Sequence, residues 1–432
     1  MCTNSGGSPR KIIAIIGAQT LAAGALGLLC SLGVLVGLSG CAGPAATPPV
    51  TSAAIAMPPA DRSPARLNRA IKEATGYLVR ACDEDGRFIY QQHPNYPLPR
   101  STYNILRHAG TTWALSWAHA HAPGAETAGA LRRSAQYLLT TSVAPVEEGR
   151  GRTAMLALWS RPEIEGHNQP LQAKLGGAAL AIIALSEAER ITPGLVSREQ
   201  LRQLGRFLVF MQRPDGSFYT RYIPDAGGRT AKPASIYYPG QAALALIHLH
   251  QHNPKGSWLK AAGRALGHII EQRPHIVVEQ WTALACAQLL QTKGYRDAIL
   301  SRKTIRTYAE QLAKKIMEEQ LIHTDNPGLV GSLEHRGRTA ATATRVEALL
   351  ALHTILARTD PMLAHGIRTC CDEAIGFLLN AQFTTGPCRG GFPRSGGIRG
   401  ADAFFRAQER TVRIDTVQHA LSALIGFTRS RH

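Results

Sequence analysis

The chain has 432 residues, of which 44% are hydrophobic and 18% charged, and its 48 Lys and Arg outnumber 30 Asp and Glu to give a formal charge of +18. This composition excludes a disordered chain, and the length fits one large closed domain or two ordinary domains rather than one small module. Aromatic residues make up only 6% of the chain, which argues against a pocket walled by stacked rings.

The amino-terminal segment has the features of an export signal. It contains no Asp or Glu before residue 42, and an apolar run from Ile12 to Leu38 follows Arg10 and Lys11. The order Leu38-Ser39-Gly40-Cys41 resembles a bacterial lipobox, which implies that Cys41 is lipidated and that residues 1–40 are removed as a lipoprotein signal peptide. A permanent membrane-spanning helix is the alternative, because the apolar run is long enough to span.

The next segment, residues 41–63, is rich in Ala and Pro and is typical of a semi-extended tether without a core. We therefore expect a folded domain over residues 64–432, anchored by lipid to a membrane of the bacterial cell envelope and facing the periplasm or the cell surface. A basic protein at that location favours an anionic partner, such as an acidic glycan, lipopolysaccharide or anionic lipid. A solvated basic surface is the alternative, and no nucleic-acid partner is expected.

Five cysteines follow the predicted lipidation site Cys41, and an odd number excludes a complete disulfide framework. A bridge between Cys82 and Cys388 stays open, whereas Cys286 lies in an apolar helical stretch and is predicted to pack in the core. No Cys-x-x-Cys pair or Gly-rich phosphate loop occurs, so we expect neither a metal nor a cofactor.

Two classes of helical segment alternate along the rest of the chain. One class is rich in Ala and Leu on most sides, and its aligned leucines are Leu115, Leu180, Leu244, Leu284, Leu349 and Leu421. The other class is amphipathic and is centred near Leu78, Leu138, Leu208, Ile269, Ile316 and Leu378. A helix that is apolar on most sides must be surrounded, whereas one with a polar face lies outside.

Twelve helices that alternate between outer and inner positions predict an all-α fold, an (α/α)6 toroid of six helical hairpins. An open superhelix is the structural alternative, since helical repeats also form solenoids. Strand signals are almost absent, and the best short run is Ile276-Val277-Val278.

Several outer segments end in a glycine turn followed by an aromatic residue, as in residues 85–88, 215–218 and 390–392. Glycine adopts the left-handed conformation that stops a helix, so the aromatic side chain can fold back onto the hairpin. The segment from Phe207-Leu208 through Gln212 to Gly216-Ser217-Phe218 resembles the repeat of the terpenoid cyclase and protein prenyltransferase superfamily, and a weaker copy runs from Phe377 to Gln382. The resemblance implies a toroid in which the repeat is a structural brace. Six-hairpin glycosidases and several polysaccharide lyases use the same toroid.

Polar residues stand just ahead of the Ala- and Leu-rich segments, at the helix ends that point into one funnel in such toroids. Burying such groups without partners would cost about 1–3 kcal/mol each, so we expect them to face water, one another or a ligand. The predicted acid–base residues are His108, Tyr238, Glu347, Asp415 and His419. The predicted substrate-binding residues are Asn104, Arg107, Lys174, Tyr237, Glu279, Trp281, Arg345 and Arg413.

Two kinds of chemistry fit these residues. Two carboxylates flanking a bond, drawn from Glu279, Glu347 and Asp415, would suit glycoside hydrolysis. A uronate lyase or epimerase instead needs a cation and a base, and Asp415 lies one helical turn before His419, where a carboxylate raises imidazole basicity. A helix cap at Asp415 is the alternative explanation of that pair. The share of Arg among the candidates favours an acidic glycan.

The Asp-x-Asp-Asp acid of squalene–hopene type cyclases and the zinc ligand set of prenyltransferases have no recognisable counterpart in the sequence, which disfavours carbocation chemistry. We therefore predict a lipid-anchored toroid that binds an envelope glycan and acts on it as a hydrolase, lyase or epimerase. A non-catalytic scaffold in polysaccharide assembly or export is the alternative. A cyclase-like enzyme with an apolar substrate is a third hypothesis.

Overall fold

The computed structural model describes residues 60–98, 103–147, 154–254, 256–271, 275–396 and 408–431. The predicted signal peptide, the lipidation site Cys41 and the tether up to residue 59 lie outside these ranges. Within them, no helix is both long enough and apolar enough to cross a membrane.

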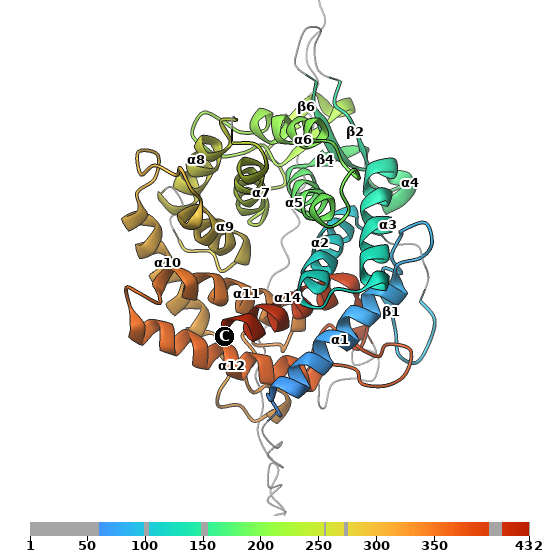
Figure 1. Cartoon of the computed structure of the whole chain (residues 1–432), viewed down its shortest axis with the longest axis vertical. Helices are drawn as coiled ribbons and strands as arrows, with labels where there is room; N and C mark the ends of the chain where they lie inside the picture. Colours follow the sequence, from blue (N-terminus) through green and yellow to red (C-terminus); the bar gives the residue numbers. More distant parts are fainter. Residues whose placement is uncertain are drawn as a thin grey trace, which may run out of the picture. The chain divides into compact units, whose positions relative to one another are not determined.

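The Ala- and Leu-rich segments form an inner ring of six helices: α2 (Ile105–His121), α5 (Leu175–Ile191), α7 (Tyr238–His252), α9 (Gln280–Gln291), α11 (Thr339–Leu356) and α14 (Ile414–Ser430). Each inner helix packs against the next, and α14 packs against α2, so the ring is closed (Figure 1). In α5, thirteen of the 17 residues are buried, because neighbours surround it. The predicted (α/α)6 toroid is confirmed, and the closure excludes the open superhelix.

The amphipathic segments form the outer ring: α1 (Pro64–Ala81), α3 (Ala125–Thr141), α6 (Arg198–Phe210), α8 (Trp258–Glu271), α10 (Arg302–Glu318) and α12 (Pro361–Ala381). Four of these helices begin behind a side-chain oxygen that accepts a backbone N–H of the first turn, supplied by Ser63, Ser197, Ser301 and Asp360. Such caps satisfy donors that a helix start leaves unpaired. Each outer helix then buries one face against the inner ring.

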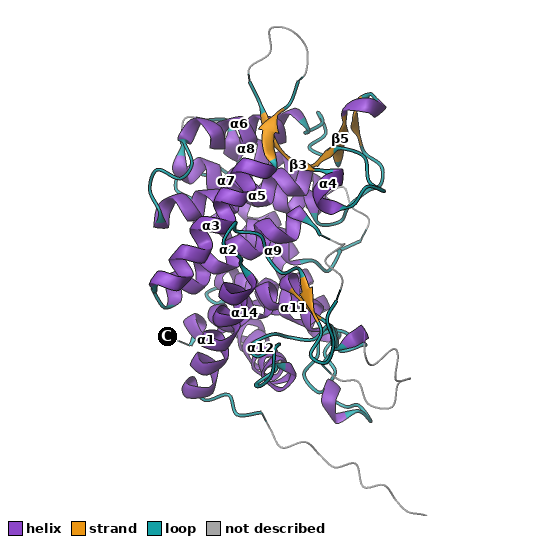
Figure 2. Cartoon of the chain, turned by 90° about the vertical axis from the view of Figure 1, so that its right-hand side faces the viewer, coloured by secondary structure: helices purple, strands orange, loops and turns teal. Residues whose placement is uncertain are grey.

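Short strands flank the ring where inner helices begin. A five-stranded antiparallel sheet has the spatial order β2 (Val143–Pro145), β3 (Leu156–Ser160), β4 (Gln172–Lys174), β5 (Arg221–Ile223), β6 (Gly228–Thr230). A two-stranded ladder pairs β1 (Gln91–Gln92) with β7 (Val412–Arg413). Figure 2 shows the strands on one side of the helices, and β4 and β7 run directly into α5 and α14. Three short helical turns complete the described elements: α4 (Pro162–Glu165), η1 (Pro224–Ala226) and η2 (Pro327–Leu329).

The sequence did not predict these strands. The run Ile276-Val277-Val278, its best strand signal, lies in a loop before α9. The observed strands are two to five residues long, which is too short for an alternating pattern to show.

Four outer helices end in turns of the same geometry. In each turn a glycine adopts a left-handed φ of 87° or 88°, and a Cβ atom there would come within 2.0 to 2.3 Å of a backbone carbonyl oxygen of the next outer helix. These glycines are Gly86 after α1, Gly216 after α6, Gly331 after α10 and Gly390 after α12. Because the carbonyl beside Gly390 belongs to Glu73 in α1, the last outer helix is joined to the first.

In three of these turns, the side-chain amide of a glutamine joins the turn to the same outer helix that the turn glycine approaches. Gln382 donates to the carbonyl of its turn glycine (3.3 Å) and to that of Ala70 in α1 (2.9 Å). Gln212 and Gln320 make the equivalent pairs of bonds to α8 and α12. The brace implied by the resemblance is therefore present at Gln212 and Gln382. The copy at Gln320 was not predicted, because a longer loop separates it from its glycine.

All five cysteines in the described part of the chain are free and buried. Cys82 and Cys388 therefore form no bridge. The thiol of Cys82 instead lies 3.6 Å from the carbonyl oxygen of Ala130 in α3. In the other three turns a glutamine amide occupies the corresponding position. Cys286 is fully buried in α9, as predicted.

Candidate active site at the amino-terminal mouth

A cavity of about 520 Å³ opens between the amino-terminal ends of the inner helices, and we call it the amino-terminal mouth. Every inner helix, or the residue directly before it, contributes to the lining. Eight of the thirteen predicted site residues line it: Asn104, Arg107, Tyr237, Tyr238, Trp281, Arg413, Asp415 and His419. Helix starts expose unpaired N–H groups and carry partial positive charge, so this mouth favours anionic or oxygen-rich ligands.

A carboxylate held between two guanidinium groups lies at one side of the mouth. Arg413 donates to both oxygens of Asp415, at 2.5 and 2.8 Å, and Arg107 Nε lies 2.9 Å from Asp415 Oδ2. Burial raises the pKa of Asp415, but the two arginines outweigh burial and hold it below its usual value. Asp415 is therefore an anion whose oxygens are already engaged, so it positions the arginines and is a poor proton donor.

His419 lies beside this cluster and is paired with a second carboxylate. Its Nδ1 is 3.2 Å from both oxygens of Glu347, which comes from the neighbouring helix α11. Burial lowers the pKa of His419, but Glu347 and Asp415 outweigh burial, so the pKa lies above its usual value. When neutral His419 donates its Nδ1 proton to Glu347, Nε2 is left as a base, 3.4 Å from the amide nitrogen of Gln418. The hydrogen-bonded partner of His419 is thus Glu347, and not Asp415 as the sequence suggested.

Aromatic rings form part of the wall and floor. Trp281 lies edge-on to His419 at 6.5 Å between ring centroids, and Trp113 stacks behind Trp281 at 5.9 Å. Tyr237 is 46% exposed at the rim, whereas Tyr238 is half-buried, and burial raises the pKa of its phenol. Tyr237, Tyr238 and Trp281 are thus the three aromatic residues of the described ranges that line this cavity, among mainly polar and aliphatic groups.

Two predicted residues support the mouth from behind. Lys174 donates to Glu165 Oε2 (2.9 Å), and Glu165 Oε1 accepts the backbone N–H of Ile105 (2.8 Å), so this ion pair ties the start of α5 to the start of α2. The carboxylate of Glu279 accepts the N–H groups of Trp281 (2.7 Å) and Thr282 (3.0 Å) and caps α9. Both residues are buried and orient helix starts outside the lining of the cavity.

Two further predicted residues lie away from the mouth. His108 is fully buried in α2, accepts the Tyr103 hydroxyl at Nδ1 (2.7 Å) and donates from Nε2 to the carbonyl of Ser134 (2.9 Å). Burial lowers its pKa to about 4, so it is a neutral core histidine near pH 7. Arg345 Nη2 pairs with Glu319 at 2.5 Å.

Several lining residues were missed by the sequence analysis: Gln241, Gln280, Arg338, Arg394, Glu409 and Gln418. Arg338 directly precedes α11, as Arg413 precedes α14, so a comparison of the residue before each inner helix would have found it. Gly110 gave another signal, because a Cβ atom there would lie only 2.5 Å from Gln418 Nε2. A glycine in an inner helix can therefore mark a position where a lining side chain of the next inner helix packs against the helix backbone.

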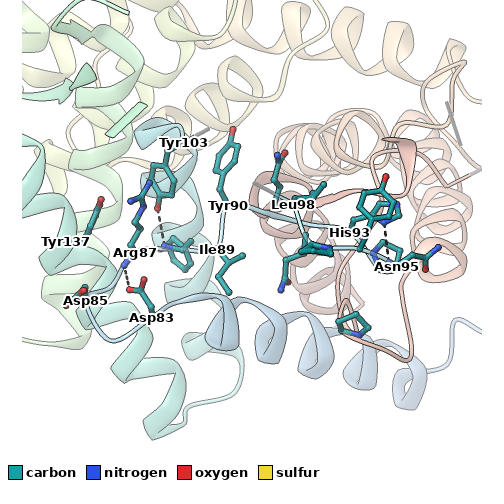
Figure 3. A pocket seen from close by; sticks show the side chains of 17 residues that line it. Asp83, Asp85, Arg87, Ile89, Tyr90, His93, Asn95, Leu98, Tyr103 and Tyr137 are labelled. Atoms are coloured by element: carbon teal, nitrogen blue, oxygen red, sulfur yellow. Dashed lines mark hydrogen bonds between the residues drawn. The ribbon is translucent and has the colours of Figure 1, made fainter. Parts of the chain in front are cut away.

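A second cavity, of about 720 Å³, adjoins the mouth and is lined mainly by Asp83–Leu98 (Figure 3). Tyr90 stands in its wall, and its hydroxyl accepts a hydrogen bond from Arg107 of the mouth. Arg87 lies over the ring of Tyr103, 4.6 Å from its centroid. The shared Tyr90–Arg107 pair means that the two cavities are neighbours along one rim.

Across the described ranges, no three His, Cys, Asp or Glu residues are grouped so that they could hold a metal ion. The site therefore consists of the arginine cluster, the His419–Glu347 pair and the aromatic floor. This set can bind an anion and move a proton.

No known family model matches the chain, and no curated protein matches its sequence. Solved structures do match. D-mannose isomerase aligns over 87% of this chain and 100% of its own, with TM-score 0.59 and 14% identity. An unsaturated glucuronyl hydrolase specific for heparin aligns over 85% and 98%, with TM-score 0.56 and 13% identity. An inactive variant of the α-1,6-mannanase of Salegentibacter sp., in complex with α-1,6-mannotriose, aligns over 84% and 99%, with TM-score 0.56 and 11% identity. The chain thus has the α/α toroid fold of these proteins, as the likeness to six-hairpin glycosidases implied.

Proposed function

We propose that the amino-terminal mouth binds an acidic glycan and that His419 transfers a proton to and from it. The observation that carries this proposal is that His419, which is paired with Glu347, lines the same cavity as Arg107 and Arg413. A carboxylate-bound imidazole is a base of useful strength near neutral pH, and guanidinium groups bind carboxylates with paired hydrogen bonds.

The charge of the mouth supports an anionic substrate. Four arginines line it (Arg107, Arg338, Arg394, Arg413) against two carboxylates (Glu409, Asp415). The helix starts add partial positive charge to this excess. A uronate would place its carboxylate among these donors, and its sugar ring against Trp281 or Tyr237.

The arrangement of the carboxylates favours proton transfer at carbon over hydrolysis. Hydrolysis needs two free carboxyl groups on either side of the scissile bond. Asp415 is held by two arginines and Glu347 lies behind His419, which leaves Glu409 as a single lining carboxylate and not the pair that hydrolysis requires. In the alternative reaction, His419 Nε2 takes a proton from the carbon next to the sugar's carboxylate, and the arginines stabilise the enediolate that forms. In an epimerase a second acid, for which Tyr238 is the candidate, delivers a proton to the opposite face of that carbon. In a lyase the oxygen substituent on the next carbon leaves instead, and Tyr238 protonates the leaving oxygen.

The structural neighbours support a carbohydrate substrate in general. An isomerase and a glucuronyl hydrolase specific for heparin both act on carbohydrates, and the mannanase variant holds a mannotriose. The same toroid therefore occurs in an isomerase and in a hydrolase, so the fold leaves the reaction open and the proposal rests on the residues at the mouth.

We also propose that the protein is a lipoprotein of the bacterial envelope, on the strength of the lipobox-like order at Cys41. The carbonyl of Arg62 accepts a hydrogen bond from Arg431, just beyond the carboxy-terminal end of α14. The chain preceding α1 therefore joins the ring at the end opposite the amino-terminal mouth.

Deuterium exchange tests the proposed chemistry without knowledge of the product. The protein is incubated in D2O with oligosaccharides of galacturonate, glucuronate and mannuronate, and deuterium at the ring carbons is followed by NMR and mass spectrometry. We expect exchange or elimination with at least one uronate, lost in His419→Asn and kept in His335→Asn, a control at an exposed loop histidine. Binding without exchange would support the scaffold interpretation. Neither binding nor exchange with any acidic or neutral glycan would overturn the proposal.

A further inference from the structure

The ring has a second hollow at its other end, between the carboxy-terminal halves of the inner helices. It consists of two cavities of about 390 and 350 Å³, each within the range of small-molecule sites, roughly 300–1,000 Å³. Both are lined by Trp113, Trp117, Leu284, Ala351, Thr354 and Arg429, so we treat them as one carboxy-terminal mouth.

An aromatic partition separates the two mouths. Trp281 lines the amino-terminal mouth, Trp113 lines the carboxy-terminal mouth, and the two indoles stack at 5.9 Å with an angle of 29° between their planes. Two stacked rings and the His419–Glu347 pair therefore stand between the two mouths.

The carboxy-terminal mouth differs from the first in chemistry. Trp113 and Trp117 meet edge to face at 5.8 Å, and Arg429 lies 5.4 Å from the ring centre of Trp117. The carboxylates that line it have cationic partners, since Glu187 is paired with Arg190 (3.1 Å) and Glu347 with His419. Amide and hydroxyl groups complete the lining, among them Ser116, Gln288, Gln291, Thr354 and Ser422.

We propose that the carboxy-terminal mouth is a second binding site, which takes a short neutral saccharide. The C–H face of a pyranose packs on an indole face, and its hydroxyl groups suit amides, hydroxyls and the unpaired carbonyl groups of helix ends. An anionic ligand fits less well, because six helices end here with partial negative charge. This site involves no chemical step and does not depend on the function proposed for the amino-terminal mouth.

The chain has five tryptophans, and NMR signals of their indole N–H groups can distinguish binding at the two mouths. Trp117 reports on the carboxy-terminal mouth and Trp281 on the amino-terminal mouth, whereas Trp159 in β3 and Trp258 in α8 line neither. Indole N–H signals are assigned by Trp→Phe replacement, and the full chain is titrated with cellobiose and α-1,6-mannotriose. We expect the signal of Trp117 to shift, and those of Trp159 and Trp258 to stay.

Two variants place the binding. Trp117→Ala should weaken saccharide binding by about tenfold or more, measured by calorimetry. Thr354→Arg, at an exposed position of the lining, should block the mouth if Trp117→Ala does not fold. Tyr237→Ala, at the rim of the other mouth, is the matched control and should leave the affinity unchanged. This proposal would be overturned by any of three results. These are NMR shifts confined to Trp281, loss of saccharide binding in Tyr237→Ala, and no shift of the Trp117 signal with either saccharide. None of these results bears on deuterium exchange with uronates.

Discussion

Closure of the outer ring depends on a glycine whose replacement can be matched with a nearby control. Gly390 and Gly386 lie in the same loop after α12, with φ of 87° and 73°. At Gly390 a Cβ atom would lie 2.0 Å from the carbonyl oxygen of Glu73 in α1, whereas at Gly386 it would meet nothing within 4 Å. Replacement by alanine therefore adds backbone strain at both positions and a collision at only one.

We expect Gly386→Ala to lower the free energy of unfolding by about 1–2 kcal/mol, the usual cost of a left-handed L-residue. Gly390→Ala carries the same strain and must also push α1 away, which loosens the bond from Gln382 to Ala70. Overpacking typically costs about 1–3 kcal/mol, so the total is about 2–5 kcal/mol.

The assay is equilibrium urea unfolding followed by circular dichroism, with both variants measured beside the parent chain. Equal losses in the two variants would refute the view that α12 and α1 meet at Gly390. Gly216→Ala, at the equivalent turn between α6 and α8, should behave like Gly390→Ala.

Three other predictions concern ionisable groups. Glu347→Gln should lower the pKa of His419, measured by histidine NMR, because the carboxylate that opposes the effect of burial is removed. An unchanged pKa of His419 would contradict its pairing with Glu347. His108, with a folded pKa of about 4 against a usual 6.5, should contribute stability that is present above pH 6.5 and is lost as pH falls towards 4, by about 3 kcal/mol. His108→Asn should remove that part of the pH dependence, and an identical profile would show that His108 is not buried neutral. Arg413→Gln should weaken binding of a uronate oligosaccharide about tenfold in calorimetry and leave the affinity for cellobiose unchanged, whereas equal weakening of both would argue against charge recognition.

The helical architecture could be predicted because it depends on the local periodicity of apolar residues. Segments such as Leu175–Ile191 are apolar on most sides and must be surrounded, and their alternation with amphipathic segments leaves few arrangements besides a ring. The brace was recognisable only where Gln and Gly stand close together, as at Gln212 and Gly216. At Gln320 the bonds are the same but the spacing is not, so the pattern is hidden in sequence.

The site was predictable in its location but not in its pairings. Residues at inner helix starts gather at one mouth because the helices are parallel in the ring, and this brought Arg107, Arg413 and His419 together. Which carboxylate meets His419 depends on the rotation of α11 against α14, which only packing determines. Sequence likewise could not tell that His108, one residue after Arg107, turns into the core.

A crystal structure of the His419→Asn variant with a bound uronate oligosaccharide would test the central claim most directly. We predict that the sugar occupies the amino-terminal mouth, with its carboxylate in contact with Arg107 or Arg413 and the adjacent C–H directed at residue 419. A sugar bound elsewhere, or one whose carboxylate faces away from these arginines, would contradict the proposed chemistry.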